Sequence, residues 1–158
     1  MKKEEIEFLK ESNAIEREYS QESLEDAIKA WVMACINSQQ INIYYILGIH
    51  RRLLARLNPK IMGKIRKCPV MIGGKTKFTS KEEIICELIK LCEIIPKTEK
   101  EIKEWHIIFE DIHPFEDGNG RTGRILMNIQ RLKIKLPLLI IHEGEEQREY
   151  YKWFKNNR

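Results

Sequence analysis

Apolar residues recur every three or four positions along most of the chain, the spacing that places side chains on one face of an α-helix. Short polar or glycine-containing segments separate these stretches. The pattern predicts helices at 3–18, 21–40, 42–57, 80–95 and 98–112, from about 119 to 132, and at 143–157. A short extended apolar link is expected at 136–141. The sequence therefore predicts a mainly α protein.

Capping residues and prolines mark several helix ends. Ser80 with Glu83, and Thr98 with Glu101, have the spacing of a capping box, in which two side chains satisfy the first backbone N–H groups. Three helices are expected to end ahead of a proline, at Pro59, Pro96 and Pro114. Buried faces are expected at Ile102, Trp105, Phe109 and Ile112, at Ile125, Leu126, Ile129 and Leu132, and at Tyr151 and Phe154.

One segment departs from the helical pattern. Residues 68–78, CPVMIGGKTKF, hold β-type residues on both sides of Gly73 and Gly74. A two-residue Gly-Gly loop suits the positive-φ turns that join twisted strands. We therefore predict a β-hairpin here.

Length and charge add two expectations. The 158 residues carry no repeat, low-complexity tract or linker, so we expect one domain over 1–158 with its own core. The net charge is only +4, but residues 51–77 carry nine Lys and Arg and no acid, whereas residues 1–26 carry nine acids against four bases. We expect the two segments to complement each other; steering of acidic or nucleotide partners is the alternative for the basic run.

The cysteines and the apolar runs bear on location. The four cysteines show no metal-binding or redox spacing: Cys35, Cys68, Cys86 and Cys92. The N-terminus lacks the apolar core of a signal peptide, and no apolar run reaches the roughly 18 residues of a membrane span. We expect reduced thiols, a soluble cytoplasmic protein and no membrane partner.

Residues 113–124, HPFEDGNGRTGR, concentrate polar and glycine-rich chemistry between two predicted helices. Gly118 and Gly120 allow the loop to turn backbone N–H groups toward one point, at a helix N-terminus whose dipole also favours negative charge. Arg121 and Arg124 lie three positions apart, so their guanidiniums are expected on the same side. This set suits a polyphosphate.

Two more side chains in this loop bring further chemistry. Asp117 supplies the hard oxygen that Mg²⁺ takes when phosphate and water provide its other ligands. His113 titrates near neutral pH and could accept a proton from a hydroxyl. Each feature alone has an ordinary explanation: a plain glycine turn, a structural His, or solvated arginines. Their conjunction favours a functional site.

That conjunction resembles the Fic family motif, His-x-Phe-x-(Asp/Glu)-Gly-Asn-Gly-Arg-x-x-Arg, which is complete here from His113 to Arg124. Less specific similarity covers LGIHRRLL, GKIRKCPVMIGG and QREYY. The resemblance implies a compact Fic-type helical bundle with one β-hairpin flap. It also implies a protein adenylyltransferase, which transfers AMP from ATP to a Ser, Thr or Tyr hydroxyl of a protein.

The resemblance assigns a role to each matching residue. His113 would be the general base, Asp117 would hold Mg²⁺, and Phe115 would be a buried anchor. The phosphates would be held by Gly118, Asn119, Gly120, Arg121 and Arg124. The flap would align a target segment as an added strand, through Val70, Met71, Ile72, Gly73 and Gly74. A hairpin that merely covers the core is the alternative.

Many Fic proteins carry an inhibitory helix with the pattern (Ser/Thr)-x-x-x-Glu-(Gly/Asn), whose Glu pairs with the second arginine of the motif. Ser12 and Glu16 match this pattern within the expected inhibitory helix, residues 1–19. Arg17 departs from the usual Gly or Asn. Thr79 with Glu83 also matches the bare spacing, but the first pair lies ahead of the core, where one class of the family keeps its inhibitory helix.

Three functions remain open on sequence alone. The first is AMP transfer from ATP to a protein target, which could be the protein itself. The second is removal of AMP, or transfer of another nucleotide. The third is a non-catalytic binder that uses the basic segment, although the intact His113 argues against it. We do not expect nucleic acid as a partner, and a homo-oligomer is left open.

Overall fold

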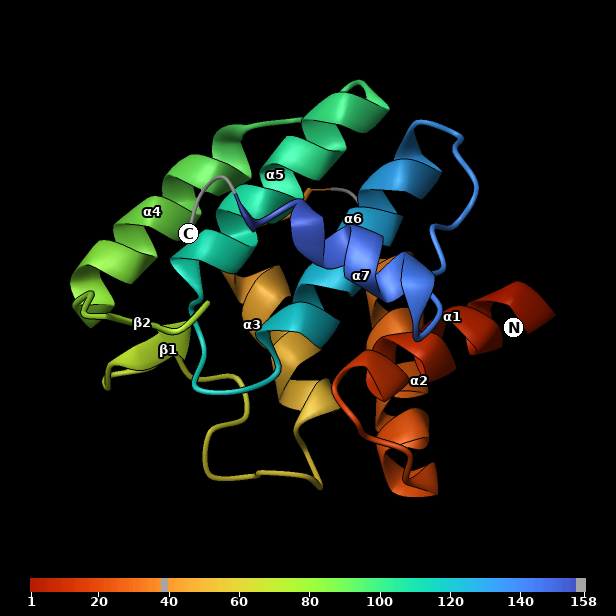
Figure 1. Cartoon of the computed structure of the whole chain (residues 1–158), viewed down its shortest axis with the longest axis horizontal. Helices are drawn as coiled ribbons and strands as arrows, with labels where there is room; N and C mark the ends of the chain where they lie inside the picture. The colour runs from red at the N-terminus through yellow and green to blue at the C-terminus, as the bar shows by residue number, and fades with distance from the viewer. Residues whose placement is uncertain (38–39, 156–158) are drawn as a thin grey trace.

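The computed structural model describes residues 1–37 and 40–155. Within them the chain forms seven α-helices and one antiparallel hairpin (Figure 1). The elements are α1 (Lys3–Ile15), α2 (Gln21–Ile36), α3 (Ile43–Leu53), β1 (Val70–Ile72), β2 (Lys75–Lys77), α4 (Lys81–Glu93), α5 (Glu99–Ile112), α6 (Asn119–Lys133) and α7 (Glu145–Lys152). The prediction of a mainly α fold with one hairpin is confirmed. No helix in the described part is long and apolar enough to cross a membrane.

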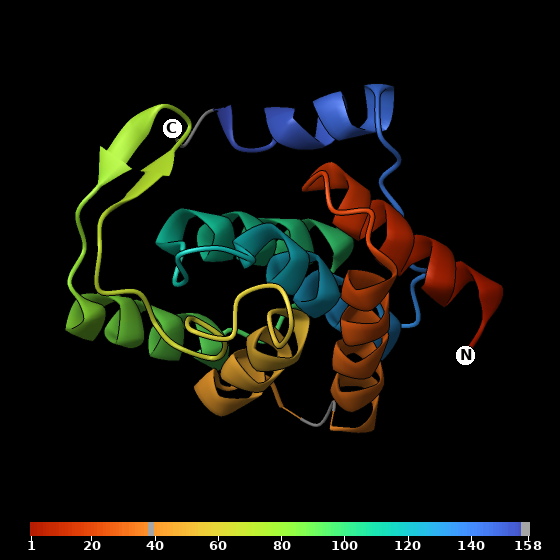
Figure 2. The ribbon, with the colours of Figure 1, turned by 90° about the horizontal axis from the view of Figure 1, so that it is seen from below.

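Helix α6 lies at the middle of the molecule (Figure 2) and contacts α1, α2, α3 and α5. Every residue from 121 to 131 is buried, polar ones included. The prediction of one apolar face is therefore too narrow, because neighbours surround this helix. Leu132, expected to be buried, is 43% exposed in its last turn.

Helix α2 supplies much of the core beside α1 and α3. Ala27, Ala30 and Ala34 are fully or almost fully buried, and such small side chains permit close packing. Phe8 of α1 meets Trp31 of α2 edge-on, with ring centroids 5.3 Å apart. These contacts fix α1 against the rest of the fold.

Several helices are shorter than predicted. Helix α3 ends at Leu53 rather than 57, because Pro59 sets only a latest end and the chain turns earlier. Helix α4 ends at Glu93 rather than 95, and α2 ends at Ile36 rather than 40, with residues 38–39 outside the described part. Helix α1 ends at Ile15, not 18 or 19. The ends of helices are the least determined by apolar spacing.

The predicted capping boxes form to different extents. At α4, Ser80 Oγ accepts from the Glu83 N–H while Glu83 accepts from the Ser80 N–H. At α5, Thr98 Oγ1 accepts from the Glu101 N–H, but the Glu101 carboxylate accepts from Lys97 instead. The second box is therefore only half formed.

Helix α7 packs on α5 and α6 through a second apolar cluster. Its members include Ile102, Met127, Tyr150 and Phe154. Tyr151, expected to be buried, is 45% exposed, because the buried face of α7 falls one residue earlier, at Tyr150. This shift brings the Tyr150 side chain close to the polar residues of α6.

The hairpin pairs Val70 with Lys77 and Ile72 with Lys75. Gly73 and Gly74 have φ values of 55° and 79°. Positive φ at both central residues is the requirement of the turn that best fits twisted strands. The hairpin prediction is confirmed.

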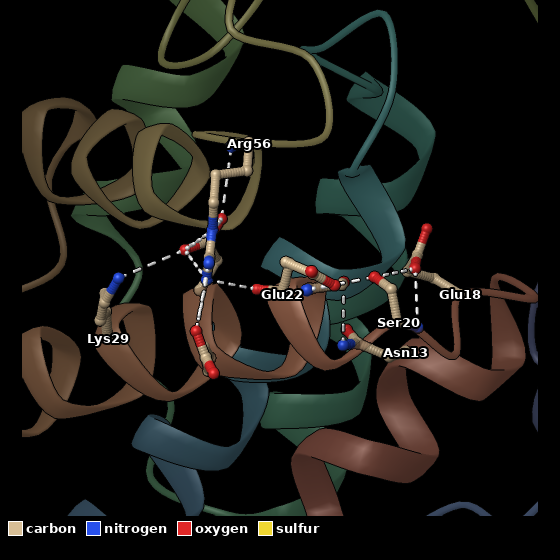
Figure 3. Close-up of polar contacts among 9 residues, drawn as sticks. Asn13, Glu18, Ser20, Glu22, Lys29 and Arg56 are labelled. Atoms are coloured by element: carbon tan, nitrogen blue, oxygen red, sulfur yellow. Dashed lines mark hydrogen bonds and ion pairs between the residues drawn. The ribbon is translucent and has the colours of Figure 1, made fainter.

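Arg56 accounts for the pairing of the basic run with the acidic N-terminal segment (Figure 3). Its guanidinium lies 2.8 Å from Asp26 Oδ1 and 3.1 Å from Glu25 Oε2, and it donates to the Glu22 carbonyl at 2.7 Å. The other bases of the run have different surroundings: Arg66 is buried, and Lys60, Lys64 and Lys67 are exposed. The expected complementarity holds for Arg56.

Candidate active site

His113 is the C-cap of α5, in the left-handed conformation with φ 51°. Its Nδ1 lies 3.2 Å from the Glu110 carbonyl oxygen. A carbonyl can only accept, so Nδ1 carries the proton of the neutral ring and Nε2 carries the lone pair. The ring is therefore held in the tautomer that a general base acting through Nε2 needs.

Arg66 holds the backbone of this histidine. Its Nε donates to the His113 carbonyl at 2.7 Å, its backbone N–H donates to the Pro114 carbonyl at 2.9 Å, and its Nη1 donates to the Cys68 carbonyl at 3.0 Å. The residue is only 1% exposed. Arg66 thus ties the segment before the hairpin to the start of the candidate catalytic loop, residues 113–118.

Phe115 is fully buried, as expected of an anchor, and stacks on His50 with centroids 3.7 Å apart. The Asn119 side chain accepts from the Phe115 N–H and donates to the Phe115 carbonyl, both at 2.9 Å. The side-chain amide of Asn119 is therefore engaged within the loop. Any contact with a phosphate falls to its backbone N–H at the start of α6.

His50 holds the other end of the loop. Burial lowers its pKa to about 4, so the ring is neutral near pH 7. Its Nδ1 accepts from the Gly63 N–H and its Nε2 donates to the Asp117 carbonyl, both at 2.9 Å. A Cβ on Gly118, which has φ 79°, would come within 2.6 Å of Leu54. Glycine is required there by both conformation and space.

Asp117 presents an exposed carboxylate at the mouth of the loop. Its Oδ1 accepts from the Gly118 N–H at 2.6 Å, and its Oδ2 lies 3.6 Å from Arg121 Nη2. The described residues contain no group of three or more potential metal ligands. A single protein carboxylate fits Mg²⁺ only where phosphate and water supply the remaining ligands.

Arg121 is almost completely buried, yet its Nε and Nη1 have no hydrogen-bond partner among the described residues. Buried guanidinium N–H groups without acceptors are costly. Their position in the first turn of α6, beside the glycines and Asp117, marks a place where an anionic ligand would be stabilised.

Arg124 is also buried, but its donors are satisfied by α1. Nε donates to Ser12 Oγ at 2.9 Å, and Nη2 donates to the Ser12 carbonyl and to Glu16 Oε1, both at 2.8 Å. A Cβ on Gly120 would lie 2.3 Å from that same Glu16 oxygen. The Glu16 carboxylate therefore lies directly over the glycine-rich start of α6.

A second set of polar residues lies near Arg124. The Tyr150 ring centroid is 5.9 Å from its guanidinium carbon, and the Tyr150 hydroxyl is 2.8 Å from His106 Nε2. Burial lowers the pKa of His106 to about 3, so this contact involves a neutral ring. A Cβ on Gly123 would come within 2.4 Å of Glu110 Oε1, so glycine leaves room for the Glu110 carboxylate.

The Fic/DOC family sequence model matches residues 40–130, which span α3 to α6 and include most of the loop and arginine geometry above. The chain belongs to the Fic/DOC family. Protein adenylyltransferase fic-1 of Caenorhabditis briggsae is 32% identical over 123 residues, covering 71% of this chain and 23% of the relative. Protein adenylyltransferase Fic of Aedes aegypti is 27% identical over 148 residues, covering 82% and 28%. The chain thus spans about a quarter of the length of these curated relatives.

Solved Fic proteins have the same fold. A structure of Fic-1 residues 134–508 carrying E274G, from Caenorhabditis elegans, superposes with a TM-score of 0.77 at 22% identity, covering 96% of this chain and 55% of that chain. A Fic domain-containing signaling protein from Bacteroides thetaiotaomicron gives a TM-score of 0.77 at 22% identity, covering 94% and 69%. The Fic-type fold predicted from the motif is confirmed.

The Fic motif residues lie together in this structure around the N-terminus of α6, and Ser12 and Glu16 meet them from α1. Glu16 is the C-cap of α1 rather than a residue within the helix, because the chain leaves α1 in a turn with Arg17 at φ 57°. The hairpin is tied to the end of α5 by a hydrogen bond from Lys77 Nζ to the Asp111 carbonyl. Met71 is exposed on the hairpin, whereas Ile72 is buried.

Proposed function

We propose that this Fic protein transfers AMP from ATP to a hydroxyl group of a protein target. The observation that carries the proposal is Arg121, which lies in the first turn of α6 and has two buried N–H groups without partners among the described residues. A triphosphate would satisfy donors that the described chain does not. The naming of the relatives as protein adenylyltransferases supports the same reaction.

In this proposal, His113 activates the attacking hydroxyl. Its Nε2 takes the hydroxyl proton as the oxygen forms a bond to the α-phosphorus of ATP. The bond from that phosphorus to the bridging oxygen of the β-phosphate breaks, and pyrophosphate leaves. The Nδ1 contact with Glu110 fixes the tautomer, and Arg66 fixes the backbone that carries the ring.

Asp117 would hold Mg²⁺ together with phosphate oxygens. When bound, the ion supplies charge neutralisation for the α- and β-phosphates. The exposed Oδ2 of Asp117 suits this role, since Oδ1 is held by the Gly118 N–H. Arg121 and Arg124 would neutralise the outer phosphates, and the backbone N–H groups of Gly118 and Gly120 would cradle the chain of phosphates.

We also propose that Glu16 inhibits this reaction. Its carboxylate pairs with Arg124 and lies over Gly120, so it takes the place of a phosphate on both groups. ATP would then be excluded or would bind with its α-phosphate out of line with the hydroxyl. Ser12 reinforces the contact, since its hydroxyl and carbonyl accept from the same guanidinium.

The function is tested by incubating the full chain with α-labelled ATP, Mg²⁺ and cell lysate, and by locating the label by mass spectrometry. Glu16→Gly is used as the active background. In that background His113→Ala should lower labelling by about 10²- to 10⁴-fold while ATP binding is retained. Undiminished labelling by the His113→Ala variant would refute the assignment.

The metal site is tested in the same assay. Asp117→Asn should lower labelling and raise the Mg²⁺ concentration needed, whereas the neighbouring Glu116→Gln should change neither. A stronger loss from Glu116→Gln than from Asp117→Asn would show that the metal ligand has been assigned to the wrong residue.

A further inference from the structure

A groove of about 740 Å³ lies on the side of the molecule formed by α3, residues 60–67 and α4. Leu47, Ile61, Ile65 and Ile85 form the more buried part of its lining. Tyr44, which is 82% exposed, lies at its edge. The groove also reaches Glu116 of the catalytic loop. Figure 2 shows residues 60–67 running beside α3 and on toward the hairpin.

The groove is positively charged. Four lysines line it: Lys60, Lys64, Lys67 and Lys81. None of these ammonium groups has a carboxylate partner in the described part of the chain, and Lys64 Nζ donates only to the Lys60 carbonyl. Arg56, from the same basic run, is by contrast fully engaged by Glu25 and Asp26. Glu116 is the one acid among the lining residues that the structure describes.

Apolar lining with a charged rim is the composition of a site for a peptide segment that has both apolar and acidic side chains. Single-stranded nucleic acid is usually held by several aromatic side chains that stack on bases, together with cations along the backbone. Here the described lining has one aromatic residue, Tyr44, and several Ile and Leu side chains. The chemistry therefore favours an acidic, apolar-anchored protein segment over nucleic acid.

The groove is also connected to the catalytic loop. Its Gly63 donates to His50, which in turn donates to the Asp117 carbonyl. The same segment continues through Arg66, which holds His113, and leads into β1 at Val70. A protein segment bound in this groove would thus lie next to the loop that carries the proposed base and metal ligand.

We infer that this groove docks an acidic segment of the protein target. The segment anchors apolar side chains between α3 and α4, and its carboxylates pair with the lysines of the two walls, which are residues 60–67 and α4. The role as a docking site for the AMP acceptor rests on the proposed function. Binding of an acidic segment in the groove does not rest on it, so the binding claim and the proposed function can be refuted separately.

The test uses fluorescence anisotropy without ATP, with a short labelled peptide in which glutamates alternate with leucines. Matched peptides replace Glu by Gln or Leu by Ser, and a labelled oligouridylate of equal charge represents nucleic acid. The variant is Lys67→Glu/Lys81→Glu, with one change on each wall. Its control is Lys90→Glu/Lys97→Glu, which has the same charge change at exposed positions outside the groove.

The acidic leucine peptide should bind wild type more tightly than either matched peptide, and more weakly as salt rises. The groove variant should weaken its binding by about tenfold, the control by less than about twofold. A thermal melt checks that both variants are folded. Absence of binding to wild type, equal loss in both variants, or tighter binding of the oligouridylate would overturn the inference.

A second arm joins docking to chemistry. A serine is added to the end of the acidic peptide, and labelling from ATP is measured with Glu16→Gly and with the same protein carrying the groove changes. Labelling that falls with the groove changes supports docking of the acceptor. Binding without any labelling would remove the link to AMP transfer but would still support the groove as a peptide-binding site. Labelling that is the same with and without the groove changes would overturn only its role in docking the acceptor.

Discussion

The Glu16 carboxylate and the Arg124 guanidinium, 108 positions apart in the chain, meet at 2.8 Å above Gly120. The Arg124 side chain is 3% exposed and that of Glu16 is 37% exposed. Arg124 thus belongs to the core of the molecule, and Glu16 reaches it from the end of α1, whose inner face is also buried. Movement of the Glu16 carboxylate alone would release its contact with the arginine while Phe8 and Ile15 keep α1 in place.

Glu16→Gly should therefore activate AMP transfer. Breaking a partly buried ion pair costs several kcal/mol, but ATP would recover part of this by pairing with the same arginine. We expect a net shift of about 1.5–3 kcal/mol, or roughly 10- to 100-fold in the labelling rate. Initial rates of self-labelling or target labelling by wild type and variant provide the measurement.

Two controls accompany this comparison. Glu83→Gly changes the other glutamate that matches the bare inhibitory pattern and should not activate, because Glu83 caps α4. Arg124→Ala added to Glu16→Gly should erase the gain. Equal rates for wild type and Glu16→Gly would refute inhibition by Glu16.

Arg17→Gly should strengthen the inhibitory contact. Arg17 has φ 57°, a conformation that costs most side chains about 1–2 kcal/mol and costs glycine little. After the extra chain entropy of glycine is subtracted, we expect about 0.5–1 kcal/mol of added stability. A slightly higher melting temperature and slower labelling by the otherwise wild-type protein would be observed.

The matched control is Lys135→Gly, at another positive φ of 62° just after α6. It should raise the melting temperature similarly but leave labelling unchanged, because Lys135 makes no hydrogen bond or ion pair with the end of α1 among the described residues. If both variants slow labelling equally, the effect of Arg17 is one of general stability.

His142 links α1 to α7 in a pH-dependent way. It lies 2.8 Å from Glu146 of α7 and 3.2 Å from Glu7 of α1, and these carboxylates raise its pKa. A raised folded-state pKa gives stability that is complete below the unfolded value of about 6.5 and is lost as pH rises through the folded value. The link should therefore weaken above neutral pH.

The expected result is a stability difference between wild type and His142→Gln that is larger near pH 6 than near pH 8.5, measured by urea unfolding. The comparison with the variant is needed because the stability of either protein alone also changes with pH. Buried His50 and His106 have lowered pKa values, so both proteins become less stable as pH falls below about 6.5. Glu7→Gln should remove part of the same pH dependence. A difference that is constant over this range would contradict the link.

Arg66→Lys should lower kcat with little change in the KM for ATP. Arg66 uses two separate nitrogens of its planar guanidinium for the His113 and Cys68 carbonyls, and the single nitrogen of lysine does not reproduce that spacing. The backbone that carries the proposed base would therefore be held less firmly. A misplaced base can cost up to about 100-fold in rate. The measurement is steady-state labelling in the Glu16→Gly background. Arg56→Lys, which breaks a comparable set of hydrogen bonds away from the loop, should destabilise the fold but leave kcat unchanged.

The sequence predicted the number and kind of elements because apolar spacing and glycine pairs act locally. It placed Glu16 near Arg124 through resemblance, since no local rule connects residues so far apart. Arg66 and His50 were missed as residues that hold the loop: their partners, His113 and Asp117, lie 47 and 67 positions away. Such contacts depend on packing of whole helices, which periodicity does not describe.

One sequence-based prediction was wrong and one was incomplete. Periodicity assigns one apolar face to a helix, so it failed for α6, where Asn128 and Gln130 are buried along with the apolar residues. The resemblance assigned Asn119 to the phosphates without naming the atoms, and the structure uses its side chain to close the loop on Phe115. Apolar spacing and the motif do not show which side-chain atoms are engaged within the protein.

Because α6, which begins at the proposed phosphate cradle, is enclosed by its neighbours, its hydrogen-bonded and buried amides from Thr122 to Arg131 should be among the last to exchange with deuterated water. The amides of the hairpin, and of the exposed turn at Glu16 and Arg17 that follows α1, should exchange much earlier. The proposed inhibitory contact and the proposed flap can then open in local fluctuations while the helix behind the proposed phosphate cradle stays folded. The parts of this small chain that stay rigid would then be different elements from the parts that move.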